Sequence, residues 1–366
     1  MMASLLFSQS LTRLRSRPGH ITSWAFFTAS MAFTFYKAPS LQEPILRYAC
    51  AGTAATLFCE VIMHGIDTVN MRSKIINGPK LYVFELIKLE GFSSLMRGIQ
   101  PVLYGYFIAS LVYFYAYAQS KQVLSELLFK QESGQEVRIT EQGQQQPTTS
   151  IYYKTMAVSF IGSGFAEFLS LAFYYPFDLI KTRMQVASQG ISPSQRYLGT
   201  LDATLKIINE GAKDQKMLDQ VKGIRNLYKG GFTFGMSYTA YMAVQFSLFE
   251  SILLYLETHS GVRQQHQANP HGAKDHSWFH ISIASFLAGA LGGLLTNPIE
   301  FLAVNIQTQE NFSTMKYIRQ KGVIYDMMFK GGLWRSVYHG LQAVLFFIIW
   351  QEYAMHLNVD IAMFEE

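Results

Sequence analysis

The stretch that decides the fold is YPFDLIKTRMQ, residues 175–185, which places a proline, an acid and a base at helical spacing. Pro176 ends an apolar run, and a proline inside a helix removes a backbone hydrogen bond and bends the helix. Asp178 and Lys181 are three residues apart, so their side chains share one face of a helix. The stretch therefore predicts a hydrophobic helix that bends at Pro176 and then turns both charges inward, as at the narrow end of a membrane funnel.

The same arrangement occurs twice more, and repetition at a long period indicates a chain built from structural copies. GIDTVNMR spans residues 65–72, and PIEFLAVN spans residues 298–305. Each copy ends an apolar run and is followed by an apolar or aromatic residue, a base and a glycine, at 96–98, 228–230 and 329–331. Three ordered copies of a two-part motif predict three similar pairs of helices.

This repeat resembles that of the mitochondrial carrier family, P-x-[DE]-x-x-[KR]-x-[RK] followed by [DE]-G-x4-[FWY]-[KR]-G, over about residues 43–358. The resemblance implies an all-α membrane protein of three tandem repeats, each with two transmembrane helices and a short matrix helix, in a pseudo-threefold six-helix bundle. It also implies metabolite transport across the inner mitochondrial membrane and contacts with membrane lipids, cardiolipin at the matrix helices among them.

The three repeats are expected at residues 43–129, 152–257 and 278–358. Two polar segments separate them, a Gln-rich one at 130–151 and a His- and Gln-rich one at 258–277, and a tail follows at 359–366. Residues 1–42 contain four bases and no acid, as in a targeting segment. We expect this N-terminal extension to be retained, with a short apolar helix at 21–36 that has no role in a three-repeat fold.

Composition favours a polytopic membrane protein with polar loops, because 49% of the residues are hydrophobic, 15% are charged and the mean hydropathy is +0.12. Cys50 and Cys59 are expected to be buried free thiols. The histidines at 259, 266, 271 and 276 match no compact metal site. No nucleophile, metal or phosphate-loop pattern indicates an enzyme, a cofactor or a nucleic-acid partner.

Charge asymmetry predicts the orientation in the membrane. Residues 181–229 carry nine bases against four acids, whereas acids outnumber bases in the segment 130–150. By the positive-inside rule the motif side faces the matrix, which predicts a multi-pass inner-membrane protein with basic matrix loops.

In the family, the matrix end is closed by three ion pairs between the odd helices, where the acid of each motif meets the base of the next. Carried onto this chain, the pairs are Asp67 with Lys181, Asp178 with Ala303, and Glu300 with Asn70. Only the first pair is ionic. The helix kinks are expected at Gly65, Pro176 and Pro298.

The cytoplasmic end is closed in the family by [FY]-[DE]-x-x-[KR] on the even helices. The corresponding pairs in this chain are Ala118 with Leu253, Glu250 with Ala354, and Gln351 with Lys121. We therefore expect no ion pair at this end. A shifted alignment of the third repeat, centred on Gly340, is the alternative, and it would place Asp360 opposite Lys121.

The family's substrate-contact positions lie about two turns beyond each motif glycine. Here they are Gly105, Ser237 with neighbouring Tyr238, and Tyr338, and none is cationic. On the odd helices, Glu60 and Glu167 lie close to whole helical turns before Asp67 and Asp178. These funnel acids are either functional or packing carboxyls held protonated.

Two functions fit these patterns. Degraded closures and missing cationic contacts favour a transport-impaired carrier that serves as a structural subunit of a large, respiratory-type inner-membrane complex. The acidic funnel, with the tyrosines at 104, 238, 241 and 338, favours an active carrier of a neutral or cationic metabolite.

Overall fold

The computed structural model describes residues 18–74, 83–129, 149–187, 197–210, 223–260, 277–309, 312–319, 323–329 and 331–359. In these ranges all regular structure is helical. Most of the two polar segments between the repeats lies outside them, as do residues 211–222 and three of the four loop histidines, at 266, 271 and 276.

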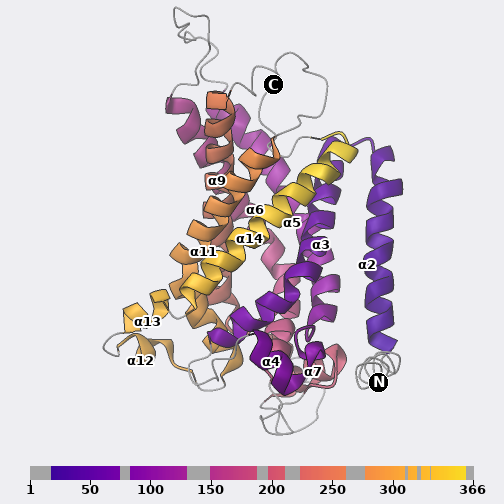
Figure 1. Ribbon diagram of the computed structural model, residues 1–366, viewed down its shortest axis with the longest axis vertical. Coiled ribbons are helices and arrows are strands. Elements are labelled where there is room, and N and C mark those ends of the chain that lie inside the picture. The colour runs from indigo at the N-terminus through magenta and orange to yellow at the C-terminus, as the bar shows by residue number, and fades with distance from the viewer. Residues whose placement is uncertain are drawn as a thin grey trace, which may run out of the picture.

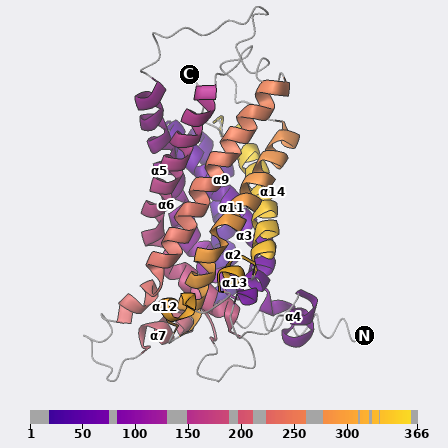
Figure 2. The same ribbon diagram turned by 90° about the vertical axis from the view of Figure 1, so that its left-hand side faces the viewer.

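Six long helices form the body of the molecule: α3 (Pro44–Ser73), α5 (Ile99–Phe129), α6 (Thr149–Val186), α9 (Gly231–Ser260), α11 (Trp278–Thr308) and α14 (Gly332–His356). Each packs against the next in this order, and α14 packs back against α3, so the six close into a ring (Figures 1 and 2). The spans at 44–73, 92–127, 153–186, 225–259 and 278–308 are long and apolar enough to cross a membrane. The predicted six-helix bundle of three helix pairs is confirmed.

Short helices gather at one end of the bundle, which we call the motif end: α4 (Val83–Glu90), α7 (Thr200–Ile208), α12 (Thr314–Ile318) and α13 (Val323–Phe329) (Figure 1). They lie within the connections inside each repeat. Short 3-10 turns adjoin them at Phe92–Ser94 and Arg225–Tyr228. The helix pairs are joined to each other at the opposite end, the loop end.

The second helix of each pair, α5, α9 or α14, is the even helix of its repeat. Each begins directly after a glycine with a positive φ. The φ angles are 82° at Gly98, 80° at Gly230 and 76° at Gly331. Glycine adopts this conformation at little cost because it has no Cβ. Gly340 instead lies inside α14 without such an angle. The shared geometry supports the alignment on Gly331, so the alternative alignment on Gly340 is wrong.

The N-terminal extension contributes helix α2 (Pro18–Tyr36), followed by a 3-10 turn at Ala38–Ser40. The predicted apolar helix is therefore present, and it packs along α3 and α5 on the outside of the ring (Figure 1). The Tyr104 hydroxyl donates to Oγ1 of Thr22, and its ring lies 5.1 Å from that of Phe26. Tyr104 thus faces α2, which corrects the expectation that it lines the funnel.

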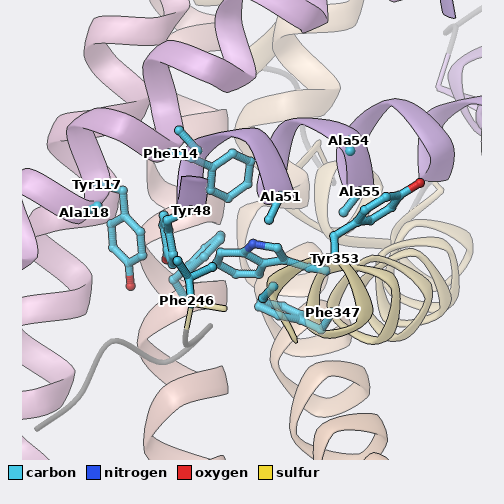
Figure 3. Packing of buried hydrophobic residues seen from close by; sticks show 14 of the residues in the cluster. Tyr48, Ala51, Ala54, Ala55, Phe114, Tyr117, Ala118, Phe246, Phe347 and Tyr353 are labelled. Atoms are coloured by element: carbon cyan, nitrogen blue, oxygen red, sulfur yellow. The ribbon is translucent and has the colours of Figure 1, made fainter. Parts of the chain in front are cut away.

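An aromatic layer fills the loop-end half of the bundle. It includes Tyr48 of α3, Phe114 of α5, Phe246 of α9 and Phe347 and Trp350 of α14, all buried (Figure 3). The Phe249 and Phe347 rings stack with their centroids 3.6 Å apart. The rings come from four of the six helices, and smaller buried residues of α6 and α11 complete the layer, so it stabilises the closed ring at this level.

Candidate functional site

The motif acids lie at the motif end on the first helix of each pair, α3, α6 or α11, which are the odd helices. Lys181 of α6 joins its own helix to α3 there. Its Nζ lies 2.9 Å from Asp67 Oδ2 and 3.7 Å from Glu60 Oε2, both on α3. Gln185 donates to Asp67 Oδ2 at 3.0 Å. All four side chains are buried. The expected contact between Asp67 and Lys181 is therefore formed.

Asp178 is partnered by a tyrosine that the sequence reasoning missed. Tyr106 of α5 donates its hydroxyl hydrogen to Asp178 Oδ1 at 2.9 Å and accepts from Lys181 Nζ at 3.2 Å. The expected partner position, Ala303, is fully buried in an apolar cluster. Tyr106 stands one residue beyond Gly105, so a count of whole turns from Gly98 passed over it by one position.

Glu300 of α11 has bases as partners, which corrects the prediction that it faces Asn70. Lys74 Nζ lies 2.9 Å from Glu300 Oε1, and Arg335 of α14 pairs with Glu300 Oε2. Arg335 also donates to Thr296 Oγ1 at 2.9 Å. Lys74 stands one turn beyond Asn70, and its long side chain spans that turn. Lys181 is therefore not alone among the buried bases at this end, since Lys74 and Arg335 neutralise Glu300.

The loop end also holds an ion pair, so the prediction of none there was wrong. Lys121 Nζ on α5 lies 2.7 Å from Glu250 Oε1 on α9, and the Tyr117 hydroxyl donates to the same oxygen at 2.5 Å. Ser159 of α6 donates to the other carboxylate oxygen. In the cyclic order of the family, Lys121 would meet Gln351 on α14. It pairs instead with Glu250 on α9.

The other positions expected at the loop-end closure are all buried: Ala118, Leu253, Gln351 and Ala354. Three of them belong to the aromatic layer, where Ala118 is labelled in Figure 3. Apolar packing thus takes the place of the family's remaining ion pairs.

The helices continue through all three expected kink positions. Pro176 lies inside α6, Pro298 inside α11, and Gly65 inside α3. An added Cβ at Gly65 would lie 3.6 Å from Leu95, an ordinary contact distance.

A cavity of about 100 Å³ lies between the two closures. Glu60 and Tyr106 line its motif side and also touch Lys181, while Phe114 and Phe246 line its other side and belong to the aromatic layer. Glu167 of α6 lines it as well, so both predicted funnel acids face this space. No lysine or arginine of the described chain lines it.

Of the predicted substrate-contact positions, Tyr238 alone is among the residues that line the cavity. A Cβ at Gly105 would lie 2.4 Å from the Phe177 ring, so this glycine permits α5 and α6 to touch. Ser237 donates to the Thr296 carbonyl at 3.5 Å, and Tyr338 packs with Cys59 and Met63. Whole-turn counting placed these residues at helix contacts, not at the cavity wall.

The part of the chain that the structure describes contains no group of three or more His, Cys, Asp or Glu side chains placed to hold a metal ion. Both cysteines are free and buried. His259 lies in the last turn of α9, where its ring nitrogen is 2.9 Å from the Tyr255 carbonyl.

Comparison with known proteins agrees with this architecture. The family model "Mitochondrial carrier protein" matches residues 41–127 and 153–260. The chain is 26% identical to mitochondrial substrate carrier family protein E of Dictyostelium discoideum, over 76% of this chain and 81% of that one. It is 25% identical to nicotinamide adenine dinucleotide transporter 1, chloroplastic, of Arabidopsis thaliana, over 80% and 84%. It is also 25% identical to solute carrier family 25 member 36-A of Danio rerio, over 72% and 71%.

Three repeats of two membrane helices, the buried motif acids and the matched family model lead to one conclusion. The chain belongs to the mitochondrial carrier family.

Proposed function

We propose that this chain is an inner-membrane carrier that moves a small neutral or cationic solute by alternating access. The observation that carries the proposal is the central cavity, lined by two carboxylates and by no described lysine or arginine. Ionisable side chains inside a membrane domain mark solute pathways by default, and acids favour a positive charge.

The two closures support transport because both ends of the bundle have one. One depends on the contact between Lys181 and Asp67 and on the bases around Glu300, the other on the contact between Lys121 and Glu250. An alternating cycle needs two closed ends of similar free energy. Ion pairs, tyrosine hydroxyls and packed rings are present at both ends, so neither end is left without a closure.

The cavity also argues against a nucleotide cargo. The relative in Arabidopsis is named for nicotinamide adenine dinucleotide, whose diphosphate carries negative charge. In this chain such a group would lie beside Glu60 and Glu167 with no cationic side chain on the cavity wall. Like charges in a site of low dielectric repel strongly.

The motif end is proposed to face the matrix, because the bases of residues 181–229 gather there. Protease added to mitoplasts should then cut within residues 130–148 and 261–276 and spare the connection that contains α7. The reverse cleavage pattern would overturn this orientation.

A second candidate is the accessory-subunit role, which α2 favours. This helix contacts α3, α5 and α14 at once, so it can hold three members of the ring in one arrangement. Native-gel migration of gently solubilised membranes separates the candidates, since a free carrier migrates near 41.5 kDa and a subunit far above it.

The decisive test of transport is uptake by the purified chain in liposomes, with a panel of amino acids, polyamines, nucleotides and carboxylates. We expect saturable uptake of a neutral or cationic member, and its loss in Glu167→Gln. If no solute enters, or if only nucleotides or carboxylates do, the proposal fails.

A further inference from the structure

The cavity wall is formed largely by aromatic rings, and four tyrosines follow one another around it. The ring centroids of Tyr106 and Tyr174 are 5.8 Å apart, those of Tyr174 and Tyr238 are 5.7 Å apart, and those of Tyr238 and Tyr241 are 5.8 Å apart. All four rings line the same space. They come from α5, α6 and α9, so three helices together build the wall.

Two carboxylate oxygens at this wall have unused bonding capacity. Oε1 of Glu167 has no hydrogen-bond partner among the described residues, and the side chain is 2% exposed. Oε2 of Glu60 has none either, since Lys181 Nζ stands 3.7 Å away. Glu167 makes no salt bridge within the described chain. A buried carboxylate without a counter-charge is costly, and a cation in the cavity would offset that cost.

From these observations we propose that the cavity binds a methylated ammonium ion, a nitrogen cation whose methyl groups face the tyrosine rings. Tyrosine rings attract such a cation through the quadrupoles of their faces, most strongly where water is excluded. Tyr106 and Tyr241 already have cations of the protein over their rings, Lys181 Nζ at 5.2 Å and the Arg335 guanidinium at 5.8 Å from the ring centres, which leaves Tyr174 and Tyr238 for the ligand. The identification of the ligand rests on the cavity alone, and its movement across the membrane rests on the proposed carrier function.

Methylation is inferred from the mainly apolar surface of the wall. A primary ammonium has three N–H donors that must each find an acceptor when buried. Rings and apolar groups such as Ala109, Ala343 and Met242 make up most of the wall's surface, and beside the two acids its polar side chains are Thr56, Ser110, Ser170, Gln245, Gln342 and the tyrosine hydroxyls. A methylated nitrogen donates few hydrogen bonds or none, and its methyl groups pack on rings.

The volume of the cavity sets a limit on the size of the ligand. An engineered apolar protein cavity of about 150 Å³ admits benzene, and this one measures about 100 Å³. The space is therefore smaller than one that admits benzene, which limits a ligand bound in this arrangement to a small head group. A dinucleotide would require the closures to open and the cavity to widen.

Calorimetry with the purified full-length chain tests the proposal, with tetramethylammonium and choline as probes. The matched control ligand is 3,3-dimethyl-1-butanol, which has the shape of choline but a carbon in place of the charged nitrogen. We expect choline to bind at least about tenfold more tightly than this alcohol, equivalent to about 1.4 kcal/mol. We call the proposed ammonium site, formed by the tyrosine rings and the two acids, the cage. Equal affinities of choline and the alcohol, or no binding of either cation by the folded protein, would contradict it.

Variants distinguish a ring effect from a hydroxyl effect. Tyr174→Leu and Tyr238→Leu should weaken choline binding about tenfold, whereas Tyr174→Phe keeps the ring and should change it less than threefold. Glu167→Gln should also weaken binding about tenfold. Tyr104→Leu is the control, because this ring packs against α2 outside the cavity. The proposal is wrong if Tyr174→Phe loses as much affinity as Tyr174→Leu.

Uptake measurements separate this inference from the proposed function. Choline binding without uptake in liposomes would uphold the cage and contradict transport. Saturable uptake of another solute that excess choline does not inhibit would uphold transport and contradict the cage.

Discussion

At the scale of single residues, Lys181 of α6 contacts polar groups of both α3 and α5 at the motif end. Its ammonium contacts Asp67 and Glu60 and donates to the Tyr106 hydroxyl, and its side chain is 5% exposed. The backbone of Lys181 also lies against Gly98, directly before the start of α5. Lys181 thus links the charges of α3, the hydroxyl of α5 and the position of α6.

Replacing Lys181 by methionine should strongly destabilise the protein. Removal of one partner from a buried ion pair leaves the other uncompensated, at a cost of about 3 to 5 kcal/mol. The measurement is the melting temperature of the purified protein. Adding Asp67→Asn to Lys181→Met should recover part of the loss, because it removes one unpaired carboxylate.

The control for this change is Lys206→Met on α7, whose ammonium lies 3.0 Å from Asp202 in a half-exposed pair. Exposed pairs of this kind contribute about 0.2 to 1 kcal/mol. Equal losses at Lys181 and Lys206 would show that the charges around Lys181 are hydrated or protonated.

Residue partners were the least predictable part of the site. The motif spacing correctly brought Asp67 to Lys181, because that pair joins matching positions on adjacent repeats. It missed the partners of Glu300, since Lys74 and Arg335 lie outside the motif and reach inward on long, flexible side chains. Sequence periodicity fixes the face of a helix, but it does not fix the rotamer of a lysine.

At the scale of elements, the glycine before each even helix fixes how that helix begins. Gly98 has φ of 82°, and an added Cβ would lie 3.1 Å from the Lys181 carbonyl oxygen. Gly91 has nearly the same angle, 81°, but a Cβ there would meet nothing within 4 Å. Both glycines thus need a positive φ, but Gly91 has ψ of 163° and lies outside the left-handed α region, and the two also differ in packing.

Alanine substitutions at these glycines should reveal that difference. Gly91→Ala costs backbone strain alone, about 1 to 3 kcal/mol for a residue held in a sparsely populated region. Gly98→Ala adds an overpacking cost of about 1 to 3 kcal/mol, because the neighbour is backbone that cannot easily move. Thermal unfolding of the two variants measures the gap. Equal losses would mean that α6 can withdraw from Gly98 freely.

The outer helix α2 shows what the repeat pattern could not predict. Its composition predicted an apolar helix, and the helix is present, but a three-repeat pattern has no position for a seventh member. Met31 packs both into the aromatic layer and against Leu57 and Leu103, and its sulfur accepts from the Tyr353 hydroxyl at 3.4 Å. The contact of α2 with α14 became visible only in three dimensions.

Met31→Ala should therefore loosen the attachment of α2. The side chain is partly buried, so we expect a loss of about 1 to 2 kcal/mol, below the range for full burial. Phe33→Ala is the control, because that ring is 47% exposed and should change stability by less than about 0.5 kcal/mol. Limited proteolysis within residues 18–43 reports detachment directly. Unchanged protection in Met31→Ala would show that α2 is held by other contacts.

At the scale of the whole molecule, two closures flank one cavity. The closure at the motif end contains the pair of Lys181 and Asp67, and the closure at the loop end contains the pair of Lys121 and Glu250. The number of helices and their pairing could be predicted from the repeated motif, since it recurs once in each pair. The loop-end closure could not, because its pairing departs from the cyclic order of the family.

Cys59 offers a direct view of how these closures work. It lines the cavity and is 2% exposed, so a reagent can reach it only when one closure opens. Loss of the pair at one end should favour the state that is open at that end, because differential stability of the two states sets their populations. Cys50, within the aromatic layer, is replaced by serine in every variant so that one thiol reports.

The most direct test of the account is the labelling of Cys59 by a membrane-impermeant thiol reagent applied to each side of oriented vesicles. Lys121→Met should increase labelling from the side of the loop end, and Lys181→Met should increase it from the side of the motif end. If neither variant changes labelling, or if both increase it from the same side, the two closures do not alternate around this cavity and the carrier mechanism proposed for this chain is contradicted.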